Sequence, residues 1–131
     1  GRVHRTVTAE NQPLNKVKIE VIQASADPKK RKSYFEPIKL ERTRDTGIRH
    51  LDGTISMARN ADPDSARDEF FICIGDQPEL DFGGKRNPDG QGFAAFGHVL
   101  KGMDVVREIQ RQAVDGQYLL EPVAIKSVER R

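Results

Sequence analysis

Short apolar segments of strand length recur along the chain and determine the architecture it predicts. Residues 17–22 (VKIEVI) and 122–130 (PVAIKSVER) alternate apolar with polar side chains, the pattern of a half-buried strand. Residues 70–74 (FFICI) and 92–100 (GFAAFGHVL) are continuous apolar runs of strand length. Residues 35–40 (FEPIKL) are a weaker candidate, because their proline cannot donate to a strand ladder and belongs at an edge or a bulge.

One segment has the periodicity of a helix. Residues 103–114 (MDVVREIQRQAV) place four apolar side chains on one helical face: Val105, Val106, Ile109 and Ala113. Gly116 follows shortly afterwards as a helix stop signal. About five strands and one helix predict a mainly β barrel or sandwich with a helix packed on it. At this length we expect residues 1–131 to form a single domain.

The composition limits where a core can lie. Hydrophobic residues make up 36% of the chain and charged residues 32%, with no tryptophan, so the core must be concentrated in the few apolar segments. The longest apolar run is far shorter than the ~20 residues that span a bilayer. We therefore expect a soluble domain without a membrane partner, in the cytoplasm or the periplasm.

The charge is small overall but unevenly distributed. Residues 1–50 hold 12 Lys and Arg against 6 Asp and Glu, while residues 51–131 hold 10 against 14, so net charges of +6 and −4 add up to +2. The basic maximum is Lys29–Lys32. Because almost no aromatic residues are interleaved with it, a solvated basic loop is favoured over a nucleic-acid contact, which stays the minor alternative.

The titratable residues form no recognisable metal or nucleophile motif. His4, His50 and His98 are scattered without ligand spacing, so we expect no metal. The single Cys73 excludes an intramolecular disulfide and lies within FFICI, where a thiol is expected to be an inert core residue. Ser56 and Ser65 lack the G-x-S-x-G context of a hydrolase nucleophile.

Four stretches, in this order, carry a resemblance to a known family: GTISMAR, EFFICIG, LDFGGKRNPDGQGFAAFG and GMDVV. The chain resembles the cyclophilin-type peptidyl-prolyl cis-trans isomerases, especially bacterial members, over residues 1–114 and most densely over 53–106. The resemblance implies a closed, antiparallel, eight-stranded barrel with helices capping its ends, and an outer groove that binds a peptide across an X-Pro bond. It implies no cofactor.

Such an activity suits a site without a nucleophile. Resonance opposes rotation about the peptide bond by ~18–20 kcal/mol, so an X-Pro bond takes tens to hundreds of seconds to isomerise. A donor near the prolyl nitrogen weakens that resonance while an apolar pocket holds the ring, which stabilises the twisted amide selectively.

The resemblance assigns catalytic roles to three residues. VHR at 3–5 is similar to the family's F-H-R, which makes Arg5 the guanidinium donor. IEVIQ at 19–23 resembles the strand that brings a glutamine, here Gln23, to the substrate carbonyl. Phe71, the second Phe of EFFI, matches the floor of the proline pocket.

The resemblance also implies a set of substrate-binding residues. Ala58 and Arg59 match a pair whose backbone meets the substrate, and Leu80 matches the pocket wall. Val21 stands where the family often has Met, and Phe93 where many members have His or Tyr.

Four departures from the family pattern bear on function. Glu69 replaces a common Gln, adds negative charge to the groove and could pair with Arg5. Ala24 and Ser25 replace a usual Gly-Gly, so a turn that needed positive φ there would be strained. Glu79 replaces a drug-contacting Trp of many eukaryotic members, so we expect weak or no cyclosporin binding. About forty residues of the family pattern have no counterpart before Gly1, so the sequence predicts an N-terminally incomplete domain with exposed barrel edges.

Two functions from different classes follow. The first is a prolyl cis-trans isomerase that acts on X-Pro bonds in peptides and unfolded proteins. The alternative is a proline-peptide binding or chaperone-like module whose groove binds but hardly catalyses.

Overall fold

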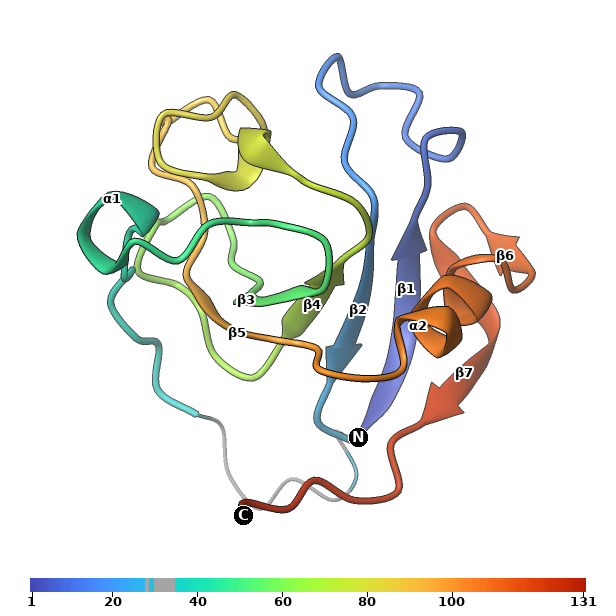
Figure 1. The fold of residues 1–131 in the computed structure, drawn as a ribbon. Coiled ribbons are helices and arrows are strands. Elements are labelled where there is room, and N and C mark those ends of the chain that lie inside the picture. The colour runs from blue at the N-terminus through green and yellow to red at the C-terminus, as the bar shows by residue number, and fades with distance from the viewer. Residues whose placement is uncertain (28, 30–34) are drawn as a thin grey trace.

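A computed structural model describes residues 1–27, 29 and 35–131. Within these residues the chain is mainly β, with seven strands in one antiparallel sheet of order β5-β3-β4-β2-β1-β7-β6 (Figure 1). The strands are β1 (Arg2–Val7), β2 (Val21–Ser25), β3 (Thr54–Met57), β4 (Phe70–Cys73), β5 (Ala95–His98), β6 (Val114–Asp115) and β7 (Tyr118–Ala124). The helices are α1 (Thr43–Thr46), α2 (Met103–Gln110) and a 3₁₀ turn, η1 (Pro78–Leu80).

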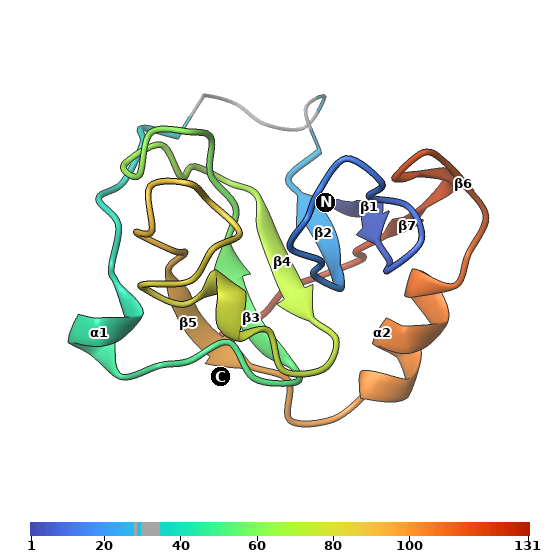
Figure 2. The ribbon, with the colours of Figure 1, turned by 90° about the horizontal axis from the view of Figure 1, so that it is seen from above.

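The mainly β, antiparallel prediction is confirmed, but the expected closed eight-stranded barrel is not what is observed. Pairing among the described residues ends at β5 on one side and at β6 on the other, so hydrogen bonds do not close the seven-stranded sheet. The short helices α1 and α2 lie at opposite sides of the molecule (Figure 2). No helix of the described residues is long and apolar enough to cross a membrane.

The apolar runs at 70–74 and 92–100 form strands β4 and β5, as predicted. The prediction of a strand over residues 17–22 was wrong, because β2 begins only at Val21. Side chains form hydrogen bonds with the backbone that precedes β2. Gln12 Nε2 donates to the carbonyl of Ile19, and Arg86 Nη1 donates to the carbonyl of Val17. These bonds satisfy the carbonyls of Val17 and Ile19 without a ladder partner, and backbone pairing with the β4 side begins only at Glu20, whose carbonyl accepts from the N–H of Ile74.

Three other predicted elements also differ. Helix α2 ends at Gln110 and not at 114, because residues 114–124 form the β6–β7 hairpin around Gly116, whose φ is +63°. The final strand lies at Tyr118–Ala124 and not at 122–130. Residues 35–40 contribute only the isolated bridge of Ile38 to Ala66.

Strand β1 was not predicted, yet it positions the candidate site. It pairs with β2 on one side and β7 on the other, and both ladders shift register between Val3 and Arg5. A bulge of this kind re-aims the side chains that follow it. After the shift Arg5 lies opposite Gln23 on β2 and Tyr118 on β7.

Strand β2 divides the core in two. Its even-numbered residues pack under α2 in a cluster of buried side chains: Val3, Ile22, Ala24, Ile74, Val106 and Leu119. Successive side chains of a strand point to opposite faces, so Val21 belongs to a second cluster, with Val7, Ile19, Phe71, Cys73 and Leu80. The second cluster forms the floor of the groove described below.

The Ala24–Ser25 pair and the basic run at 29–32 were also singled out from the sequence. Ala24 lies within β2 and Ser25 ends it, and no described residue other than glycine has a positive φ, so the anticipated strain at this pair does not arise. Of the basic run, Lys30, Arg31 and Lys32 lie outside the described residues.

Cys73 is fully buried in β4, and burial raises the pKa of its thiol to about 12. Since the thiolate is the reactive form, we predict that a chromogenic disulfide reagent does not label the folded chain within minutes at about pH 8. Unfolding in urea should release one reactive thiol per chain. Rapid, complete labelling of the folded protein would contradict this burial.

Candidate functional site

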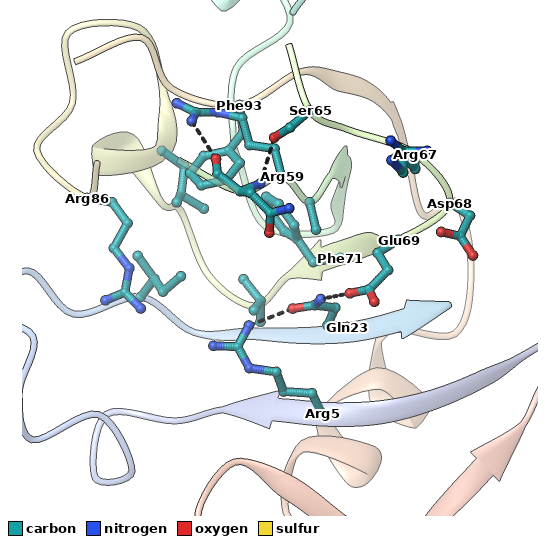
Figure 3. Close-up of a pocket in the computed structure, with 15 residues that line it drawn as sticks. Arg5, Gln23, Arg59, Ser65, Arg67, Asp68, Glu69, Phe71, Arg86 and Phe93 are labelled. Atoms are coloured by element: carbon teal, nitrogen blue, oxygen red, sulfur yellow. Dashed lines mark hydrogen bonds between the residues drawn. The ribbon is translucent and has the colours of Figure 1, made fainter. Parts of the chain in front are cut away.

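A groove of about 390 Å³ lies against β1, β2 and β4 and is bordered by the loops at 58–69 and 80–93 (Figure 3). The structure brings all nine residues singled out from the sequence to this one groove: Arg5, Val21, Gln23, Ala58, Arg59, Glu69, Phe71, Leu80 and Phe93. Six further residues that sequence reasoning missed also line it: Ile19, Asn60, Ser65, Arg67, Asp68 and Arg86.

A chain of hydrogen bonds crosses the groove from Arg5. Its Nη1 donates to Gln23 Oε1 at 2.6 Å, and Gln23 Nε2 donates in turn to the carboxylate of Glu69. The anticipated contact between Arg5 and Glu69 therefore runs through Gln23 (Figure 3). Because a carboxylate can only accept, Glu69 holds the Gln23 amide with its oxygen toward Arg5.

Gln117 orients Arg5 from the other side. Its Oε1 accepts from Nε and Nη2 of Arg5, at 2.9 and 2.5 Å, and its Nε2 donates to the carbonyl of Asn11. Burial lowers the pKa of Arg5, opposed by the charges of Tyr118 and Glu69, yet a guanidinium stays protonated. The result is a fixed cation at the edge of the groove.

The groove has an apolar floor. Phe71, Val21 and Leu80 are all buried. The ring of Phe93 stands edge-on to Phe71, with centroids 5.5 Å apart and planes at 88°. These side chains form a surface suited to a small apolar ring, next to the Arg5 guanidinium.

Arg59 braces the rim with its side chain, which is only 1% exposed. Its Nη2 contacts both carboxylate oxygens of Asp89, its Nε donates to the carbonyl of Gly92 at 3.0 Å, and its guanidinium lies 5.1 Å from the Phe93 ring centre. Arg59 thus ties the loop at 80–93 over the floor. The N–H of the neighbouring Ala58 donates to the carbonyl of Glu69.

The comparison with known sequences decides the family. The family described as cyclophilin type peptidyl-prolyl cis-trans isomerase/CLD matches residues 3–130. This chain belongs to that cyclophilin family.

Bacterial peptidyl-prolyl cis-trans isomerases are among its relatives. Peptidyl-prolyl cis-trans isomerase A of Dickeya dadantii is 39% identical over 105 residues, which cover 76% of this chain and 52% of that protein. Peptidyl-prolyl cis-trans isomerase B of Escherichia coli is 38% identical over 104 residues, covering 76% and 62%. Cyp18 of Streptomyces antibioticus is 43% identical over 79 residues, covering 60% and 46%. The matched region thus spans about half the length of these curated relatives.

Beneath the floor of the cyclophilin groove lies a buried polar chain that sequence reasoning missed. His50 Nδ1 is 2.7 Å from Asp81 Oδ1, and His50 Nε2 is 2.9 Å from Ser56 Oγ. The order resembles a hydrolase triad, but Ser56 is fully buried and does not line the groove, so its hydroxyl meets no substrate. The His50 ring instead stacks against Phe71, with centroids 6.0 Å apart, and supports the floor.

The burial of His50 makes stability depend on pH. Desolvation lowers the pKa of His50 below its ordinary value of 6.5, and this effect outweighs the opposing hydrogen bond and charge of Asp81. The unfolded chain therefore binds the proton more tightly. The stability contributed by neutral His50 is present above about pH 6.5 and is lost as the pH falls toward the folded pKa.

We predict that the free energy of unfolding decreases below about pH 6.5, by up to about 1.4 kcal/mol per pH unit from this group. Urea unfolding between about pH 5 and 8 measures it. Replacement of His50 by glutamine should flatten the slope, whereas His98→Gln, at an exposed position, should preserve it. An equal slope in both variants would remove His50 as the cause.

The described residues contain no group of three or more His, Cys, Asp or Glu side chains that could hold a metal ion. What they place in the cyclophilin groove is four arginines, two side-chain amides, two carboxylates and an apolar floor. This set can bind and polarise an amide. The one serine that lines the groove, Ser65, has its hydroxyl bonded to the Asn60 N–H and the Asp62 carbonyl, and no described base activates it.

Proposed function

We propose that this chain is a prolyl cis-trans isomerase that accelerates rotation about X-Pro bonds in peptides and unfolded proteins. The observation that carries the proposal is the Arg5 guanidinium, held from both sides by Gln23 and Gln117 beside the apolar floor. Family membership supports the same activity.

In the proposed mechanism the proline ring lies on the floor formed by Phe71, Leu80 and Val21, with Phe93 at its side. Arg5 donates toward the prolyl nitrogen, whose lone pair gains density as the amide twists and resonance is lost. Each 1.36 kcal/mol of selective stabilisation of that twisted state is worth a factor of ten in rate. No bond forms or breaks, so no cofactor is required.

The hydrogen bonds around Arg5 preorganise its guanidinium. Gln117 and Gln23 fix the direction of Arg5 before the substrate arrives, so its donors need no reorientation during rotation. The second N–H of the Gln23 amide is proposed to donate to the substrate carbonyl. The backbone of Ala58 and Arg59 is proposed to run alongside the bound peptide.

Weak or absent cyclosporin binding is part of the proposal. Glu79 occupies the position where many eukaryotic members have tryptophan, and its carboxylate accepts from the N–H of Lys85 at 2.7 Å. A carboxylate held in this way offers no apolar surface to a hydrophobic cyclic peptide.

One observation favours the binding-module alternative. The Gln23 amide is already bonded to Arg5 and Glu69, which leaves it fewer groups for a substrate than an unengaged amide would have. If these bonds must break before the peptide can rotate, the groove binds prolyl peptides and hardly accelerates them.

A protease-coupled assay on a short Ala-Pro peptide tests the proposal, since the protease cleaves only the trans form. The proposal expects the slow phase of cleavage to accelerate in proportion to the concentration of the chain. An unchanged slow phase, together with shifts of the groove resonances on titration with the peptide, would select the binding module.

A further inference from the structure

Two arginines, Arg5 and Arg86, lie at the same side of the groove, away from Asp68 and Glu69 (Figure 3). The pKa of Arg86 is lowered by burial and by the neighbouring charge of Arg5. Within the described part of the chain neither guanidinium forms an ion pair with a carboxylate. This end of the groove therefore carries an excess of positive charge, two guanidinium groups against the single carboxylate of Glu69, which is linked to Arg5 through Gln23.

The hydrogen bonds of Arg86 leave one edge of its guanidinium open. Nη1 donates to Gln12 Oε1 at 2.8 Å and to the carbonyl of Val17 at 2.7 Å, which fixes the orientation of the group. Nε and Nη2 donate to no atom of the described residues. No buried side-chain nitrogen of the described residues lacks a partner, so Nε and Nη2 of Arg86, a residue that lines the groove, are accessible to solvent.

The open edge has the geometry that carboxylates bind. Parallel N–H groups on Nε and Nη2 form the fork that pairs with both oxygens of one carboxylate. The loop holds Arg86 by its backbone as well, through the bond of its N–H to the carbonyl of Glu79. An acidic side chain docking here would meet an oriented donor pair and relieve the repulsion between Arg86 and Arg5.

The remaining charges of the groove are already engaged or balanced. Of the four arginines that line it, Arg59 is paired with Asp89, and Arg67 lies next to Asp68 and Glu69 at the other end. The Glu69 carboxylate accepts from Gln23. Arg86 is thus the groove arginine whose surroundings most favour an incoming anion.

We propose that Arg86 selects substrates that carry a carboxylate side chain at one position near the isomerising X-Pro bond. The inference rests on the proposed isomerase function and specifies its substrate class: acidic prolyl segments. Arg86 is then a specificity residue supplied by the loop at 81–92, separate from the donor Arg5 and the floor.

Matched peptides test the inference. Each carries either Glu or its uncharged isostere Gln at one position, from two residues before the proline to two after it, with alanine elsewhere. For the 131-residue chain at low ionic strength, kcat/KM for the Glu peptide should exceed that for the Gln peptide by about three- to tenfold at one position. Added salt should reduce this ratio, because it screens the ion pair.

The variant Arg86→Gln should bring the Glu/Gln ratio to about one. Arg67→Gln is the matched control, since it removes the same charge from the opposite end of the groove and should preserve the ratio. A ratio near one at every position in the unaltered chain would overturn the inference. So would an equal gain at every position, or a ratio that survives in Arg86→Gln.

Dissociation constants for the same peptides, measured by NMR titration, separate this inference from the proposed function. Acceleration of all peptides without any Glu preference would sink the role of Arg86 and leave the isomerase intact. Tighter binding of one Glu peptide without acceleration of any peptide would do the reverse.

Discussion

Replacing Arg5 by alanine is expected to lower kcat/KM for an Ala-Pro peptide by about a hundredfold or more, the scale on which removal of one preorganised donor acts. The variant loses the guanidinium that Gln23 and Gln117 orient beside the floor. Arg5→Lys should not restore the rate, because one ammonium cannot keep both partners and still donate to the substrate. The protease-coupled assay measures each variant.

Arg2→Ala is the matched control for this loss. Arg2 lies on the same strand, β1, but its side chain is exposed and does not line the groove. Its removal should leave the rate unchanged. Urea unfolding of both variants separates lost catalysis from lost folding, and a folded Arg5→Ala variant with full activity would refute the proposed role.

The second large effect is expected from Gly92→Ala. A Cβ at Gly92 would lie 2.7 Å from the carbonyl oxygen of Leu80 and 2.7 Å from the carbonyl carbon of Asp81, and φ here is +73°. The backbone strain of about 1–2 kcal/mol adds to an overpacking cost of about 1–3 kcal/mol. The Leu80 carbonyl also accepts from the N–H of Phe93, so a shift would deform the floor and lower kcat/KM as well.

Gly90→Ala isolates the close approach from the strain. Gly90 lies in the same loop with φ +66°, yet a Cβ there would meet nothing within 4 Å. It should cost only about 1–2 kcal/mol of unfolding free energy, with little change in rate. Urea unfolding measures the free energy of unfolding of both variants. An equal decrease in the two would show that the close approach of Gly92 to residues 80 and 81 does not restrict this position.

The pattern of apolar residues along the chain predicted strands correctly where a continuous apolar run lies in the sheet. The runs at 70–74 and 92–100 contain strands β4 and β5, whose buried side chains include Phe71, Cys73 and Ala95, although Phe96 of β5 is exposed. Pattern failed where side chains from distant residues satisfy the backbone, as Gln12 and Arg86 do before β2. It also missed β1, whose register shift between Val3 and Arg5 disrupts any simple alternation.

Some residues of the candidate site were predicted from the sequence and others were missed. Residues that match family motifs were found from the sequence and lie together around it. Gln117 and His50 were missed, because their roles depend on partners far away in sequence: Arg5 for the first and Asp81 for the second. Arg86 carried one available signal, since it lies within the stretch LDFGGKRNPDGQGFAAFG, but only the fold shows that it lines the groove and that its bonds use Nη1 alone.

Glu69 has a different role from the one expected of an acid beside a catalytic arginine. It does not contact Arg5 but fixes the amide of Gln23, the residue between them. A glutamine in its place could donate or accept, and would leave both orientations of Gln23 open. The acidic residue is therefore compatible with catalysis, provided that the bond from Gln23 to Glu69 survives substrate binding.

Two-dimensional exchange NMR on a single Ala-Pro peptide tests the isomerase activity itself, because it observes both isomers at equilibrium without a coupled protease. With an active isomerase, we expect a catalytic amount of the chain to produce cis–trans exchange cross-peaks within about a second, far faster than the uncatalysed tens to hundreds of seconds. Arg5→Ala should abolish these cross-peaks. Peptide resonances that shift on binding but show no exchange would rule out isomerase activity and leave a groove that only binds.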